Sequence, residues 1–204
     1  MDAGPNERRG EIGARSFVKE PWPPRKAIEK TTPTYAMEDE IINRVAQSKL
    51  VTIDLEDHYP KGERLVLDIK DWLYEGLIVR EKEFRQYVQE HDWEQYKDAH
   101  VALTCSTEAI VPGWVYMLLA THLQPHATKV VQGTLMDLET ALYQDVIKEL
   151  DVSGYTDKPV IIKGCSHKPV PPNAYLWLAQ KVQPVARSVM YGEACSSVPL
   201  YKRK

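Results

Sequence analysis

One stretch of the chain decides its fold: residues 111–125, VPGWVYMLLATHLQP, which recur 59 residues later as residues 170–184, VPPNAYLWLAQKVQP. At this offset, 10 of the 23 positions from 111 to 133 are identical. Unrelated sequences of ordinary composition would share about one or two positions over this length. The similarity extends upstream, so residues 96–133 and 155–192 are predicted to be two copies of one duplicated unit.

The pattern within each copy predicts a strand, a loop, a helix and a second strand. A proline costs little at the first position of a helix, because its missing N–H would have no partner there. The Gln-Pro pair then ends the helix, since a residue before proline is pushed out of the helical region. A short apolar run follows and ends at a glycine, Gly133 or Gly192. Each copy is therefore predicted to be a β-loop-α-β unit.

Outward from the repeat, apolar residues alternate between strand-like and helix-like spacing. Strands are expected at 50–55, 64–69, 100–104, 127–132, 159–163 and 186–190. Helices are expected at 41–46, 80–90, 112–124, 135–150 and 173–183. Tyr59-Pro60-Lys61-Gly62 is rich in turn formers and predicts a small N-terminal hairpin between the first two strands. The fold class is therefore α/β: a mostly parallel sheet built from the duplicated unit, with this hairpin at its N-terminal end.

Residues 1–36 differ in composition from the rest of the chain. They hold 5 of the 14 prolines and show no apolar periodicity, which is typical of a disordered tail. Met37 stands at the head of the first periodic segment and is a candidate for the true start. Residues 37–204 are predicted to form a single α/β domain.

Charge and composition exclude several classes of function. The net charge of −3 gives no electrostatic basis for binding nucleic acid or an anionic membrane. The longest apolar stretch has about 12 residues, whereas a membrane helix needs roughly 20. Three cysteines in a chain of 204 residues argue against a disulfide framework and favour a reducing compartment, the cytoplasm. The oligomeric state is left open.

The three cysteines are the candidate functional residues. Cys105 and Cys165 follow the first strand of each copy, and Cys195 follows the last predicted strand. In parallel α/β sheets, ligands bind at the carboxyl ends of the strands, so all three map to the functional edge. Three thiolates can hold zinc or an iron–sulfur cluster if a fourth ligand completes the site. His167 is the nearest candidate in sequence, and Asp54 and Glu56 are others.

Two other functions remain open for the same residues. A thiol-dependent enzyme would use Cys105 or Cys165 as nucleophile, because each precedes a helix N-terminus that can lower the pKa of a thiol. No histidine matches in both copies to serve as its base. A non-catalytic scaffold would need only structural cysteines, because free cysteines often fill space in a core.

Several segments of the chain together carry a resemblance to a known family: Leu55–Arg64, Asp68–Leu73, Leu103–Ser106, Val111–Trp114, Lys163–Ser166, Lys168–Pro171 and Tyr191–Pro199. Through them the chain resembles, over residues 38–204, a bacterial family known as domain of unknown function 2480. The resemblance implies a role beside the sulfur-mobilisation system of iron–sulfur assembly, with assembly proteins as partners, and implies no particular activity.

Overall fold

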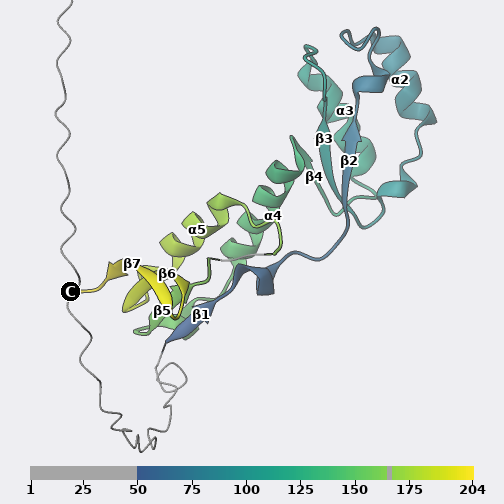
Figure 1. The fold of residues 1–204 in the computed structure, drawn as a ribbon. Helices are drawn as coiled ribbons and strands as arrows, with labels where there is room; N and C mark the ends of the chain where they lie inside the picture. The colour runs from purple at the N-terminus through teal and green to yellow at the C-terminus, as the bar shows by residue number, and fades with distance from the viewer. Residues whose placement is uncertain (1–49, 165–166) are drawn as a thin grey trace, which may run out of the picture. The chain divides into compact units, whose positions relative to one another are not determined.

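The computed structural model describes residues 50–164 and 167–204, and their strands form two sheets (Figure 1). The four-stranded sheet has the order β1-β5-β6-β7, in which β1, β5 and β6 are parallel and β7 is antiparallel to β6. The three-stranded sheet has the order β2-β3-β4, and all its strands are parallel. The strands are β1 (Val51–Ile53), β2 (Arg64–Asp68), β3 (His100–Thr104), β4 (Lys129–Gln132), β5 (Pro159–Ile162), β6 (Ser188–Glu193) and β7 (Ser196–Lys202).

The described residues also form four α-helices: α2 (Glu81–Glu90), α3 (Gly113–Leu123), α4 (Leu135–Glu149) and α5 (Pro172–Val182). The mixed α/β class and the predominance of parallel strands are confirmed. The expected single sheet is wrong, because the two β-loop-α-β units lie in different sheets. The expected tail over 1–36, the start at Met37 and the helix at 41–46 fall outside the described residues.

The two β-loop-α-β units agree in topology and in register. In the three-stranded sheet Val101 pairs with Val130, and in the four-stranded sheet Val160 pairs with Val189, each 59 residues later. Just before each first strand, Asp98 and Asp157 have left-handed backbones, with φ of 58° and 55°. This agreement is what a duplication requires, although the common origin of the two units stays a prediction.

The expected hairpin of residues 50–69 does not form between the two strands, both of which are fully described. Val51 of β1 pairs with Val160, and Arg64 of β2 pairs with His100, in parallel in both cases. Between β1 and β2 the chain forms a 3-10 helix, Leu55–His58, and then an extended segment. The turn formers Tyr59–Gly62 therefore carry the chain from one sheet to the other and do not reverse it.

Strand β7 was not expected, because Pro199 lies within it and proline has no N–H to donate to a neighbouring strand. It covers the edge of β6, with a register shift between Val189 and Met190.

The three-stranded sheet is covered on both faces. Val101 and Leu103 point to one face and pack with α2 and α3, while Ala102 between them packs with Leu138 and Leu142 of α4. This alternation follows from the two-residue period of a strand. Burial on both faces explains why β3 is apolar almost throughout.

Helix α4 contributes to two hydrophobic cores. Leu138 and Leu142 belong to the core with Ala102, whereas Tyr143 and Ile147 are buried with residues of the four-stranded sheet and α5. The helix starts with a capping box in which Thr134 and Asp137 bind each other's backbone N–H groups. The helix predicted at 135–150 is thus confirmed, and its apolar residues contribute to two hydrophobic cores.

Candidate functional site at the carboxyl edges of the sheets

Three parallel strands of the four-stranded sheet end at one edge, and a charged residue stands at each end. Asp54 follows β1, Lys163 follows β5, and Glu193 is the last residue of β6. Lys163 Nζ donates a hydrogen bond to Asp54 Oδ2 at 2.6 Å. Burial alone would raise the pKa of Asp54, but the bonds from Lys163 and from the Glu56 N–H outweigh it and hold that pKa below its usual value. A fixed ion pair therefore stands beside the exit of β5.

The chain that leaves β5 is held by Glu56. The backbone N–H groups of His167 and Lys168 both donate to Glu56 Oε1, the second at 3.2 Å. Lys168 Nζ also donates to the Glu56 carbonyl at 3.2 Å. Glu56 thus fixes the segment just after Cys165 and Ser166, which lie outside the described residues.

The exits of β5 and β6 touch each other. The Tyr191 hydroxyl donates to the Gly164 carbonyl at 3.4 Å. A Cβ atom placed on Gly164 would lie 2.8 Å from Tyr191 Cζ, closer than such atoms approach. A side chain at 164 would therefore push the Tyr191 ring away from this contact. Cys195 is exposed in the turn between β6 and β7, at the same edge.

A corresponding arrangement lies at the carboxyl edge of the three-stranded sheet. Asp68 ends β2, and its Oδ1 accepts from the N–H groups of Ser106 and Lys70, each at 3.1 Å. Cys105 follows β3, half-buried, with its Sγ 3.3 Å from Thr107 Oγ1. Burial raises the pKa of Tyr116, and the charges of Cys105 and Asp68 raise it further, so the phenol stays protonated beside them. None of these neighbours is a base suited to deprotonate Cys105 near neutral pH.

The predicted metal ligands are therefore distributed over two edges. Cys105 follows a strand of the three-stranded sheet, while His167 and Cys195 belong to the edge of the four-stranded sheet, and Cys165 lies outside the described residues. Within residues 50–164 and 167–204, no group of three or more His, Cys, Asp or Glu side chains is placed to hold a metal ion. A site made by Cys105, Cys165, Cys195 and His167 stays a prediction. The alternative ligands Asp54 and Glu56 are engaged by Lys163 and by backbone N–H groups.

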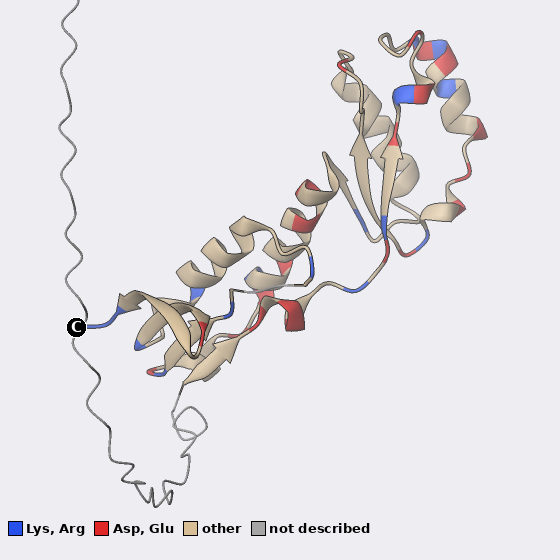
Figure 2. Cartoon of the chain, viewed as in Figure 1, with Lys and Arg blue, Asp and Glu red and all other residues tan. Residues whose placement is uncertain are grey.

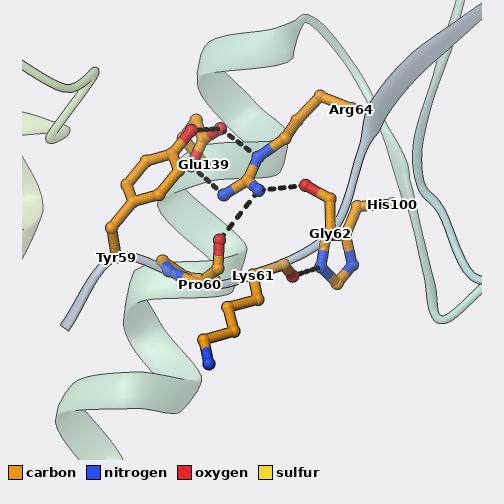
Figure 3. Close-up of polar contacts among 7 residues, drawn as sticks. All are labelled: Tyr59, Pro60, Lys61, Gly62, Arg64, His100 and Glu139. Carbon is orange, nitrogen blue, oxygen red and sulfur yellow. Dashed lines mark hydrogen bonds and ion pairs between the residues drawn. The ribbon is translucent and has the colours of Figure 1, made fainter.

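Sequence reasoning missed a second polar centre, formed by the strap, residues 59–63, which joins the two sheets (Figure 3). Arg64 Nε donates to Glu139 Oε1 at 2.7 Å and Nη2 donates to Oε2 at 3.2 Å. Arg64 Nη1 donates to the carbonyls of Pro60 and Gly62 at 2.8 and 2.6 Å. The Tyr59 hydroxyl donates to Glu139 Oε1 at 3.1 Å. Arg64 and the buried Glu139 thus fix the path of the strap.

His100 and Gly62 fix the other side of the strap. His100 Nε2 lies 2.7 Å from the Lys61 carbonyl, so this nitrogen carries the proton. Gly62 has a φ of +115°, and a Cβ atom there would lie 2.8 Å from His100 Nε2. In the sequence, the turn formers Tyr59–Gly62 of the strap predicted a hairpin, and nothing pointed to Arg64 or Glu139. The strap contributes to a small cavity of about 240 Å³, lined by Tyr59, Arg64, Leu135, Met136, Glu139 and Pro169.

Together, the two mostly parallel sheets and their helices define an α/β protein, with Cys105 and Cys195 at the carboxyl edges of its strands. The chain belongs to the family described as Protein of unknown function (DUF2480), whose model matches residues 39–203. The family resemblance seen in the sequence is thereby confirmed. Comparison with curated proteins and with solved structures finds no match. None of the helices in the described part of the chain is long and apolar enough to cross a membrane.

Proposed function

We propose that this protein binds a soft metal ion or an iron–sulfur cluster at the carboxyl edge of its four-stranded sheet, as an accessory factor in iron–sulfur protein maturation. The ligands proposed are Cys165, Cys195 and His167. Cys105 is left out of this set because it follows a strand of the other sheet. The link to maturation rests on the family resemblance and the donor chemistry.

One observation carries the proposal: β5 and β6 are adjacent and parallel, and their exits are in contact through Tyr191 and Gly164. Cys165 is the next residue after Gly164, and Cys195 lies four residues beyond Tyr191. We therefore expect the thiols of Cys165 and Cys195 to meet at this edge. Glu56 holds the backbone of His167 at the same edge.

The donor set suits a soft metal. Thiolate and imidazole groups are the preferred ligands of zinc, and thiolates hold iron–sulfur clusters. Three protein ligands leave one coordination position open, which is typical of an exchangeable site and not of a closed structural one.

The test is metal and sulfide analysis of protein purified without oxygen, followed by titration with Co²⁺ as a spectroscopic probe. The wild-type chain should bind about one ion, with thiolate-to-cobalt charge-transfer absorption. Cys165→Ser and Cys195→Ser should each remove this absorption, whereas Cys105→Ser, the matched control, should retain it. A wild-type chain that binds neither metal nor cluster would refute the proposal. Loss in Cys105→Ser alone would place the site at the other sheet.

A thiol-dependent enzyme that uses Cys105 or Cys165 as nucleophile is the second candidate. It is favoured by the position of Cys105, which is only partly buried and follows β3 ahead of the N-terminus of α3. Its test is alkylation by iodoacetamide as a function of pH. An activated thiol reacts rapidly at about pH 6, well below the range of an ordinary cysteine. Uniformly slow alkylation together with an absence of metal would leave the non-catalytic scaffold with structural cysteines.

A further inference from the structure

The cavity beside the strap combines apolar residues with a few polar side chains, which is the composition of small-molecule sites. Leu135, Met136 and Pro169 supply apolar lining, and Tyr59 adds a ring with a hydroxyl. Three segments far apart in the chain thus meet around the cavity: the strap, the start of α4 and the chain that leaves β5. An apolar cavity of about 150 Å³ can hold benzene. The volume of about 240 Å³ therefore admits one ring with a small substituent.

The charges that line the cavity balance each other. Of its lining residues only Arg64 and Glu139 are charged, and they form the buried ion pair described above. Figure 2 shows both signs, with a blue segment where β2 begins and red segments in the first turns of α4. A charged ligand would bring an unpaired charge next to a pair that is already neutral, and nothing in the lining would offset its desolvation. The cavity therefore favours an uncharged ligand.

Each polar side chain of the lining retains one unused hydrogen-bonding function (Figure 3). The Tyr59 hydroxyl donates to Glu139 but accepts no bond from the described residues. Arg64 Nη2 carries two N–H groups, and only one of them has a described partner, Glu139 Oε2. Oε2 in turn accepts only this bond from the described part of the chain, although a carboxylate oxygen can accept two. A free donor and a free acceptor thus remain on two atoms that lie 3.2 Å apart.

We propose that this cavity binds a small uncharged carboxamide with a compact apolar body. A carboxamide carries a donor and an acceptor side by side on separate atoms, as Arg64 Nη2 and Glu139 Oε2 do. Its N–H donates to Glu139 Oε2 and its carbonyl accepts from Arg64 Nη2. Its apolar body packs against Leu135, Met136 and Pro169. None of the residues that line the cavity is a proposed metal ligand, so the inference does not depend on the metal site.

The test is titration of the full chain with benzamide, followed by NMR of the backbone and guanidinium N–H groups. The wild type should bind benzamide saturably, with a dissociation constant on the order of 1 mM, because the ligand has few heavy atoms. The largest shifts should occur at the Arg64 Nε–H and at the backbone N–H groups of Leu135 and Met136. Benzoate and benzylammonium resemble benzamide in size but carry a charge. Each should bind at least about tenfold more weakly than benzamide.

Met136→Trp places a larger side chain at the cavity and should abolish benzamide binding. Met117→Trp is the matched control, because Met117 is also an exposed methionine, lies on α3 and does not line the cavity. It should bind benzamide as the wild type does. Both methionines are exposed, so the melting temperatures of the free variants should change little. A wild type that shows no saturable binding would overturn the inference, as would shifts concentrated away from the cavity or binding that survives Met136→Trp. Charged analogues that bind as tightly as benzamide would overturn it too.

Discussion

The guanidinium of Arg64 and the carboxylate of Glu139 form a two-bond ion pair across 75 residues of sequence, at 2.7 and 3.2 Å. Their side chains are only 13% and 5% exposed, and no other ion pair in the described part of the chain is as buried. Glu139 lies on α4 and Arg64 starts β2, so this pair attaches the strap to the helix that both cores share. Removing this ion pair should therefore lower the stability of the whole fold.

Replacing Glu139 by leucine should lower the free energy of unfolding by about 3–5 kcal/mol, because Arg64 would remain buried without its partner. Tyr59 would also lose its hydrogen-bond acceptor. The measurement is urea denaturation near neutral pH. Glu81→Leu is the control, since Glu81 forms an exposed pair with Arg85 on α2 and should change stability by less than about 1 kcal/mol. Equal losses in the two variants would contradict the structural role of the buried pair.

The strap should not tolerate a side chain at position 62. Gly62→Ala introduces a Cβ atom 2.8 Å from His100 Nε2 in a left-handed backbone. Gly76→Ala is the control, because Gly76 is also left-handed, at +69°, but nothing lies within 4 Å of its Cβ. Gly76→Ala should cost about 1–2 kcal/mol, the backbone strain alone. Thermal unfolding should show a clearly larger loss for Gly62→Ala, and equal losses would mean that His100 moves aside freely.

Because Asp54 forms an ion pair with Lys163, we expect the stability of the fold to fall at acid pH. The pKa of Asp54 is held below its ordinary value of 3.8 in the folded chain, so the folded state binds a proton less readily than the unfolded state. The resulting stabilisation is fully present above about pH 5 and is lost as the pH falls through 3.8 and then through the lower folded-state pKa. Lys163→Met should raise the pKa of Asp54, as followed by NMR of the carboxyl carbon. Asp151, whose lowered pKa comes first from the Ser153 N–H, should titrate as before.

The capping box of α4 should contribute measurably to stability. Thr134→Ala removes the acceptor for the Asp137 N–H and should cost about 1 kcal/mol of unfolding free energy. Thr140→Ala, inside the same helix, removes only a bond to the Met136 carbonyl and should be neutral or slightly stabilising, since alanine has the higher helix propensity. A larger loss for Thr140→Ala than for Thr134→Ala would contradict the capping role.

Local pattern predicted the elements of the fold well but not their partners. The two Pro-started helices and the strands around Val101 and Val160 follow from spacing and from the repeat. The division into two sheets does not, because the pairing of Val51 with Val160 depends on contacts across most of the chain. The turn formers at Tyr59–Gly62 were interpreted as a hairpin. The same residue types also suit a segment that carries the chain from one sheet to the other, so the sequence could not distinguish the two.

The candidate site was predictable only as far as topology allows. The order of the predicted strands places Cys105 and Cys195 at the carboxyl ends of strands. It does not predict the contact of Tyr191 with Gly164. The Arg64–Glu139 pair had no local signal, because nothing in the sequence near either residue identifies the other. Long-range polar contacts of this kind depend on the finished fold.

The order of the strands along the chain also governs how the protein can be made. Strand β1 is synthesised first, yet its partner β5 follows only after every strand of the three-stranded sheet has been translated. On the ribosome, β2, β3 and β4 can therefore assemble while β1 waits with its backbone N–H and C=O groups unpaired. Proteolysis of nascent chains arrested after α4 should accordingly cut near β1 and spare residues 64–132. The interval between these two assemblies is when the chain is most exposed to pairing with a neighbouring molecule.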